Sequence, residues 1–450
     1  MRSNVNDPTF FGEEKVGKVL LKIAPPVMLS LLIQALYNIV DSYFVGKFSD
    51  HGLTALSVIF PVQTIIIALA VGTGVGVNTL MAGEYAKKDP TAAAKSAGSG
   101  IVLNVLSWLV FAVSSIFWLK PYISIQTNAP EAAQYAFEYG VIVCVGSLGM
   151  FLESMFSKVH QAEGNMIVPT IAQIAGAVCN IVFDPLLIFG AGKIPQMGVK
   201  GAAIATVMGQ VLAAIITGIK GFRKIPSPKT VFTKAKTIYK LAYPSIVMQM
   251  MFTVYIVVLN VILAKFSDDA VTVLGLYYKI QTFFFIPLTG LSTCIVPVIS
   301  YNYMRADYKR VRLIFKDSVL ITAAFMVVGM LCFEFIPKQL LGIFTKSVAV
   351  KEIGQTAFRI IGSSFLPATL SLMFPVFFQA IGKSRPSLML TLTRQVFGLM
   401  PVFYAFSFIG LDYTWIAFPV AEVLTSVVGI VLYRHQLKLF AAEPRQNLEQ

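Results

Sequence analysis

The sequence is poor in charged residues for its length. Of 450 residues, 13% are Asp, Glu, Lys or Arg, 56% are hydrophobic, and the mean hydropathy is +0.74. An ordinary soluble domain has about 25% charged residues, and its interior cannot hide this much apolar side chain. The composition therefore indicates a polytopic membrane protein. The lack of polar or low-complexity runs also excludes large-scale disorder.

Cysteine and histidine are scarce as well. The four cysteines lie far apart without a CxxC pair, and the three histidines are scattered. This argues against a disulfide scaffold, a zinc ribbon or a histidine metal centre. The glycine-rich stretch 72–76 lies in an apolar run with no following Lys-Ser/Thr, so it is not a nucleotide loop. HExxH, GxSxG and paired catalytic acids are missing from the apolar runs, and we expect neither an enzyme nor a cofactor.

The hydrophobic residues gather in twelve long runs. A helix needs ~20 mostly apolar residues to cross a bilayer, and the even alternation of a lipid-facing strand is missing. The predicted fold is an all-α polytopic membrane protein with twelve transmembrane helices, at about 20–43, 53–82, 98–119, 134–156, 166–189, 199–221, 238–263, 270–302, 314–336, 354–378, 387–408 and 413–433.

Positive charge is divided unevenly between the two sides that these spans define. The side of the termini has 26 Lys and Arg residues, the other side has nine, and Lys279 falls within a span. The positive-inside rule puts the basic side in the cytoplasm. We therefore expect a multi-pass protein of the plasma (inner) membrane with both termini cytoplasmic. The net charge of +14 then reflects topology and contact with membrane lipids, and nucleic acid is not expected as a partner.

The two halves of the chain repeat each other at one constant, ungapped offset. This repeat offset aligns three motifs of the first half with the second, namely Lys22-x-Ala24-x-Pro26 with Lys240-x-Ala242-x-Pro244, Lys47-Phe48-Ser49-Asp50 with Lys265-Phe266-Ser267-Asp268, and Gln161-Ala162-x-Gly164 with Gln379-Ala380-x-Gly382. We predict an N-terminal six-helix bundle (1–219), a basic cytoplasmic linker (220–237) and a C-terminal six-helix bundle (238–450). Two parallel bundles are typical of alternating-access transporters. Without a nucleotide motif, the drive would be an ion gradient.

The first span has a polar face that the second half lacks. Four side chains spaced three or four residues apart share this face, and Tyr37 borders it: Ser30, Gln34, Asn38 and Asp41. The repeat offset places Leu259 where the first half has Asp41. A carboxylate in a membrane costs ~2.5–3.5 kcal/mol or more and normally has a function. The alternative is that Asp41 is merely solvated near the outer mouth, close to Lys47.

The fifth and sixth spans carry further oxygen ligands. Asn180 and Asp184 are one turn apart on one helix face, and Pro185 frees nearby backbone carbonyls. In the sixth span, Thr206 and the carbonyl of Ala202 are also one turn apart. Together with Asp41 these groups form a hard oxygen site that suits a proton or an alkali cation. The alternative for Asp184 is a helix-end residue beside a proline.

Proline in the first span suggests a moving part. Pro26 lies fifteen residues before Asp41 and removes a helical hydrogen bond, so it is a candidate hinge that responds to charge at Asp41. The alternative is a harmless proline in the first turn, which its repeat at Pro244 favours.

The chain resembles the multidrug and toxic compound extrusion (MATE) transporters over essentially its whole length. The resemblance rests on the two sets of six spans, Pro26 and Asp41 in the first span, Gln161-Ala162-x-Gly164, and above all the stretch from Asn180-x-x-x-Asp184-Pro185 to Gly190. It implies two bundles in a V shape that export cationic or amphipathic drugs, or toxic organic cations, in exchange for H⁺ or Na⁺.

The resemblance also implies roles for particular residues. Proton or cation coupling is expected at Asp41, Tyr139, Asn180, Asp184, Ala202 and Thr206, with a possible Na⁺ held by Asp41, Asn180, Asp184 and Thr206. Gln34, Tyr37 and Asn38 are expected in the substrate cavity. The span at 238–263 has no Asp or Glu, which favours a DinF-like or MepA-like branch and argues against a second cation site in the C-terminal half. We expect the protein to be a monomer. A lipid-linked precursor flippase is the alternative, but it would need several Arg or Lys in its cavity.

The charge asymmetry predicts the topology directly. A reporter that works only in the cytoplasm should be active when fused after Gln450, because the basic side faces inward. A cysteine placed at Lys229 should resist impermeant reagents added from outside. Activity of a periplasmic reporter after Gln450, or labelling at Lys229, would overturn the assignment.

Overall fold

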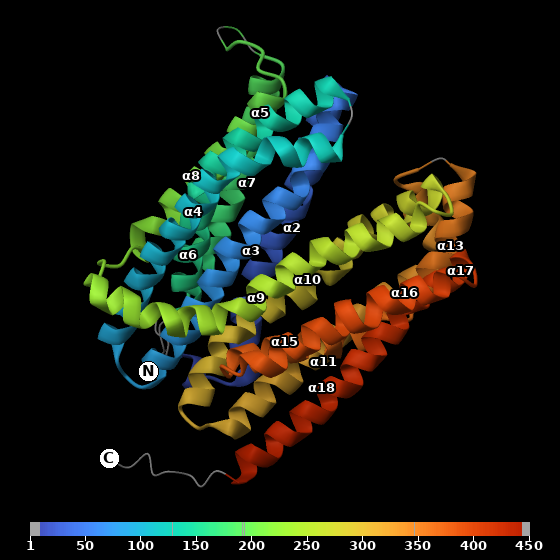
Figure 1. Cartoon of the computed structure of the whole chain (residues 1–450). Helices are drawn as coiled ribbons and strands as arrows, with labels where there is room; N and C mark the ends of the chain where they lie inside the picture. Colours follow the sequence, from blue (N-terminus) through green and yellow to red (C-terminus); the bar gives the residue numbers. More distant parts are fainter. Residues whose placement is uncertain (1–9, 128, 191, 193, 346, 443–450) are drawn as a thin grey trace. The chain divides into compact units, whose positions relative to one another are not determined.

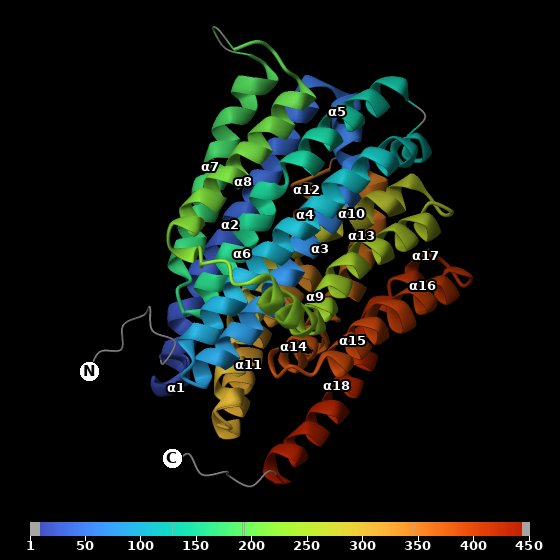
Figure 2. The same ribbon diagram turned by 60° about the vertical axis from the view of Figure 1, so that its left-hand side comes forward.

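The structure is a computed structural model that describes residues 10–442 except 128, 191, 193 and 346. The side chains at 38, 39, 42, 50, 53, 268 and 442 also lie outside the description. The described residues are largely helical (Figures 1 and 2). Ten helices are long and apolar enough to cross a membrane, and two bent pairs raise the number to as many as twelve. The predicted all-α, multi-span fold is confirmed.

The first half contains eight helices, drawn from blue to green in Figure 1. They begin and end where the sequence provides caps: Ser49 and Asp89, for example, each accept a hydrogen bond from a backbone N–H in the first turn of the next helix. Their bounds are α1 (Phe10–Glu13), α2 (Val16–Phe48), α3 (Asp50–Ala86), α4 (Pro90–Gln126), α5 (Pro130–Gly146), α6 (Leu148–Ala162), α7 (Ile167–Ile188) and α8 (Val199–Gly221).

The second half follows the same order with more interruptions. Its last third contains a π-helical segment, η1, which joins two shorter helices into one span. The bounds are α9 (Pro228–Leu263), α10 (Asp268–Met304), α11 (Tyr308–Phe335), α12 (Pro337–Gly342), α13 (Val348–Gly362), α14 (Phe365–Ala380), α15 (Ser384–Leu392), η1 (Thr393–Leu399), α16 (Met400–Ser407), α17 (Leu411–Thr414) and α18 (Ala417–Ala442).

The repeat is visible in the backbone itself. Capping by Ser49 and Asp89 recurs at their repeat positions, Ser267 and Asp307. Left-handed backbone recurs at the same offset, with Lys88 paired with Ala306 and Gly164 with Gly382. The fourth predicted span of each half is bent, by 42° between α5 and α6 and by 56° between α13 and α14. The offset read from the sequence therefore describes the local conformation of both halves.

The contacts divide the chain into two compact units. Unit 1 contains Lys22–Met250 and the described residues up to Glu13, and unit 2 contains Glu14–Leu21 and the described residues from Met251 onward. The division lies within α9 rather than at residue 238. In unit 1 the first part of α9 packs on α3: Lys234 pairs with Glu84, and the carbonyl of Ile238 lies over Gly76.

The predicted linker at 220–237 is mostly helical. Helix α8 ends at Gly221 and α9 begins at Pro228, so only residues 222–227 connect them. The basic composition of this stretch is typical of a linker, but Lys229, Lys234 and Lys236 lie on α9, and Lys234 pairs with Glu84 of α3. Two of the basic residues counted on the side of the termini, Lys158 and Arg394, are largely buried within helical segments.

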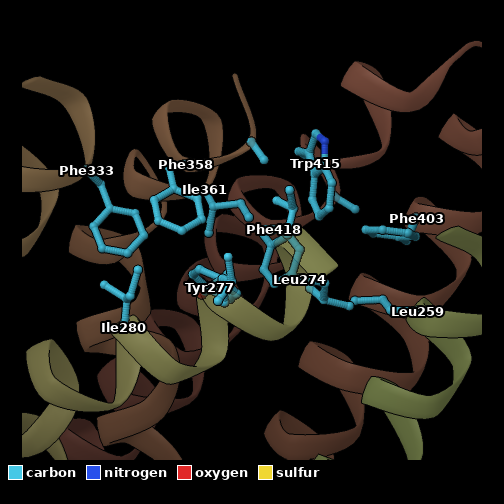
Figure 3. Close-up of a cluster of buried hydrophobic side chains, with 14 of the residues drawn as sticks. Leu259, Leu274, Tyr277, Ile280, Phe333, Phe358, Ile361, Phe403, Trp415 and Phe418 are labelled. Carbon is cyan, nitrogen blue, oxygen red and sulfur yellow. The ribbon is translucent and has the colours of Figure 1, made fainter. Parts of the chain in front are cut away.

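Each unit has its own apolar core. In unit 1, side chains such as Ile59, Phe151 and Ile188 are fully buried together. In unit 2 the core is aromatic: Phe333 stacks on Phe358, and Tyr277 lies edge-on to Phe418 (Figure 3). This core contains Leu259, the residue that stands where the first half has Asp41.

Helices α7 and α8 approach each other along small residues. A Cβ atom on Gly201 would lie 2.5 Å from the carbonyl carbon of Leu187. A Cβ on Gly209 would lie 2.6 Å from the carbonyl oxygen of Gly176. Glycine lets the two backbones meet here. This contact keeps Asn180 and Asp184 of α7 close to Thr206 of α8.

Substitution at this contact should be costly. Gly201→Ala forces α7 and α8 apart, and overpacking of this kind typically costs ~1–3 kcal/mol. Gly275→Ala in α10 is the matched control, since nothing lies within 4 Å of its added Cβ and alanine favours a helix by ~0.5–1 kcal/mol. Thermal unfolding in detergent should show a lower Tm for Gly201→Ala only. Equal Tm values would contradict the packing argument.

Candidate functional site

Two carboxyl groups meet in the interior of unit 1. Asp41 lies on α2 and is 9% exposed, and Asp184 lies on α7 and is fully buried. Their side chains are within hydrogen-bonding reach of each other. The structure thus brings together the two acids that were predicted to share one pocket. Asp184 lies in the last turn of α7 beside Pro185, but neither acid is exposed to solvent.

An amide and a hydroxyl extend this pair toward α8. The Asn180 Nδ2 atom donates to Asp184 Oδ1 at 3.3 Å and to Thr206 Oγ1 at 3.4 Å. Asn180 and Asp184 are one turn apart on α7, as their spacing predicts, and Thr206 faces them from α8. The glycine contact between α7 and α8 makes this short bridge possible.

A tyrosine and a glutamine complete the polar chain. Tyr139, which is buried on α5, makes a side-chain hydrogen bond with Thr206. Gln63 on α3 donates from Nε2 to the Tyr139 hydroxyl at 3.1 Å. The polar chain therefore runs from Asp41 through Asp184, Asn180, Thr206 and Tyr139 to Gln63. Gln63 was not predicted as a site residue, although its repetition at position 281 was a usable signal.

The carboxyl pair has no positive partner within the described part of unit 1. None of the salt bridges among the described residues involves Asp41 or Asp184. Buried oxygens also lack a hydrogen bond there, namely Asp41 Oδ1, Asp184 Oδ2 and Asn180 Oδ1. Buried charges are normally paired. The geometry therefore suits a proton shared by the acids or a small cation held by carboxylate, amide and hydroxyl oxygens.

Other predicted residues lie around this chain. Tyr37 on α2 interacts electrostatically with Asp41, Asp184 and also Glu153 of α6. Glu153 is buried and accepts a hydrogen bond from Ser157 at 2.7 Å. Glu153 was not predicted as a site residue. A single acid in an apolar run was its only signal.

Three of the predicted residues whose side chains are described, Ala202, Gln34 and Pro26, are not joined to the polar chain by a side-chain hydrogen bond. Ala202 is fully buried in α8, one turn before Thr206. Gln34 is partly buried on α2, and Pro26 lies inside that helix. The side chain of Asn38 lies outside the described residues. Within the described chain, no group of three or more His, Cys, Asp or Glu could hold a metal ion.

These features define a class: a duplicated, many-spanned helical membrane protein with a buried pair of carboxyl groups in its first half. The family model MatE matches residues 26–186 and 244–404, one match in each half at the same repeat offset. The chain belongs to the MatE family. This confirms the resemblance drawn from the sequence, and the family is one of transporters rather than enzymes.

The chain is similar along its length to curated relatives. It is 23% identical over 453 residues to the multidrug export protein MepA of Staphylococcus saprophyticus, covering 96% of this chain and 98% of the relative. It is 24% identical over 435 residues to MepA of Staphylococcus aureus, with 94% of each chain covered. The MepA-like resemblance is thus confirmed.

Solved structures share the fold. One is an outward-facing multidrug resistance MATE family transporter of the MOP superfamily, with a TM-score of 0.90, 22% identity, and 96% of this chain and 98% of that chain covered. Another is a MATE in complex with MaL6, with a TM-score of 0.89, 21% identity, and 98% and 100% covered.

Removing one acid should stabilise the protein. In Asp41→Asn the repulsion with Asp184 is lost and the amide can still hydrogen-bond, so the Tm should rise at mildly alkaline pH without Na⁺. Glu131→Gln is the control, because Glu131 pairs with His51 on the surface, where both side chains are about half exposed, and surface pairs contribute little. A lower Tm for Asp41→Asn than for Glu131→Gln would contradict an uncompensated pair.

Proposed function

We propose that the chain is a secondary active exporter of cationic or amphipathic small molecules, such as drugs or toxic organic cations. It works by alternating access and is driven by inward H⁺ or Na⁺. One observation carries the proposal: Asp41 and Asp184 lie together in the interior of unit 1 without a cationic partner among its described residues. A site of this kind needs a positive charge from elsewhere.

The coupling follows from charge balance. When the acids are charged, they attract a cationic substrate to the polar face of unit 1. A proton or Na⁺ that binds there neutralises the pair and removes this attraction. The ion and the substrate therefore compete, and coupling requires that they favour different states of the protein. Thr206, Asn180 and Tyr139 would supply neutral hydrogen-bonding groups that hold the site in shape in both states.

Helix α2 connects the charge to a movable segment. It contains both Asp41 and Pro26, and it is a single helix from Val16 to Phe48. Neutralisation of Asp41 would let α2 repack at Pro26, where the helical hydrogen bonding is already interrupted. Gln34, Tyr37 and Asn38 lie between these two points, which is why we assign the substrate to this part of α2.

The relatives support the type of substrate. The similar staphylococcal proteins are named multidrug export proteins, and a carboxyl-rich interior selects positive or neutral compounds rather than a diphosphate. The proposed location is the plasma (inner) membrane, with both termini in the cytoplasm, membrane lipids around the spans and a monomer as the working unit.

The decisive experiment uses Asp41→Asn in proteoliposomes. This variant mimics a permanently neutral site, so it should fold and insert but lose uphill transport of a fluorescent organic cation such as ethidium. Asn260→Ala is the control, because Asn260 lies on α9 beside Leu259, the repeat position of Asp41. It should retain transport driven by the gradient.

The outcomes separate the parts of the proposal. Transport by Asp41→Asn that still follows an imposed pH or Na⁺ gradient at the wild-type rate would rule out coupling at this site. Alanine at Asn180 or Thr206 should weaken the ion dependence far more than Asn260→Ala does. For the wild type, the single gradient that suffices alone identifies the coupling ion as H⁺ or Na⁺.

A further inference from the structure

Unit 2 has a buried charge cluster of its own, which differs from that of unit 1. Glu422 of α18 and Arg394 of η1 form a two-pronged ion pair: Arg394 Nη2 lies 2.7 Å from Glu422 Oε1, and Arg394 Nε lies 2.9 Å and 3.1 Å from the two carboxylate oxygens. The side chains are 12% and 6% exposed. A bidentate guanidinium–carboxylate pair of this kind is strong and directional.

Other polar groups fix both ends of the pair. The hydroxyl of Ser371 on α14 donates to Glu422 Oε2. Tyr255 of α9 makes a side-chain hydrogen bond with Arg394, and Tyr277 of α10 interacts electrostatically with both charged groups. These contacts surround the pair from several elements. Arg394 itself lies in the π-helical segment, a distortion that is frequent at functional sites.

Two neighbours of the pair occupy the repeat positions of residues beside the acidic site, whereas Glu422 itself stands at the repeat position of Ile204. Tyr255 is the repeat position of Tyr37, and Ser371 is that of Glu153. In unit 1, Tyr37 faces three carboxyl groups, whereas in unit 2 Tyr255 faces one carboxylate with a guanidinium on it. Arg394 stands at the repeat position of Gly176, where unit 1 has no side chain.

We propose that Arg394 is a built-in counter-cation. Its guanidinium supplies to Glu422 in unit 2 the positive charge that an exchangeable proton or monovalent cation supplies to the carboxyl groups of unit 1. Unit 2 is therefore a closed cation site: it keeps a fixed charge balance, binds no coupling ion, and becomes a site for a monovalent cation when Arg394 is removed. The comparison with unit 1 rests on the proposed function, but the statement about unit 2 is tested by stability alone.

The test measures cation-dependent Tm in purified protein. All variants contain Asp41→Asn, which removes the proposed cation dependence of unit 1, and the remaining acids of unit 1 are common to all of them. Three proteins are compared: Asp41→Asn alone, the same with Arg394→Gln, and the same with Arg394→Gln and Glu422→Gln. Each is titrated with NaCl and with methylguanidinium chloride at constant ionic strength, and then with acid.

The expected result is a latent site in one variant only. With Arg394→Gln, Glu422 is left buried without a partner, so the Tm should be lowest of the three and should rise by several degrees with Na⁺, methylguanidinium or acid. The variant with both Arg394→Gln and Glu422→Gln should have a higher Tm than the variant with Arg394→Gln alone, and its Tm should not rise with these cations or with acid. Asp41→Asn alone should show no response from unit 2.

Two results would overturn the proposal. One is a folded Arg394→Gln variant whose Tm responds no more than that of the variant lacking both charges. The other is an Arg394→Gln variant that cannot be recovered with any of these cations while the variant lacking both charges folds, because Glu422 would then need the tethered guanidinium itself. A cation response in Asp41→Asn alone would count against the proposed role of unit 1 and leave the comparison within unit 2 intact.

Discussion

Two carboxyl groups held in an apolar bundle, with no cationic side chain paired to them among the described residues, determine much of unit 1. Asp41 and Asp184 come from different helices, and each would be costly alone in a low-dielectric interior. Their neighbours are neutral hydrogen-bond donors and acceptors, which position the carboxyl groups but supply no positive charge. The close approach of α7 and α8 through Gly176, Gly201 and Gly209 keeps Asn180 and Asp184 beside Thr206.

Duplication has preserved the backbone more faithfully than the chemistry. Caps, bends and left-handed residues recur at equivalent positions of both halves. The buried charges do not, since Leu259 replaces Asp41 in an aromatic core and an arginine stands where unit 1 has Gly176. A helical scaffold that satisfies its own backbone hydrogen bonds tolerates such replacements as long as each buried charge finds a partner.

Much of this was predictable from the sequence, for a physical reason. Span-length apolar runs and one ungapped offset are properties of local sequence, so the helices and the repeat follow from it. Helical spacing also placed Asn180 beneath Asp184. Contacts between distant segments were harder to predict. The residues around Glu422 in the sequence do not indicate that it pairs with Arg394, and those around Tyr139 do not indicate that it bonds to Gln63. The basic residues of 220–237 suggested a cytoplasmic linker, because helix α3, on which the start of α9 packs, is far away in sequence.

The turn between α3 and α4 and its repeat between α10 and α11 have the same backbone conformation with different side chains. Lys88 has φ 59° and Ala306 has φ 56°, a conformation that costs ~1–2 kcal/mol for residues with a side chain. Both copies are closed by the same backbone hydrogen bonds, with Asp89 N–H donating to Glu84 and Asp307 N–H to Asn302. Two unlike side chains thus accept the same unfavourable geometry. The conformation of this turn is therefore set by the ends of the two helices that it joins. The side chain at the left-handed position can differ between the two copies.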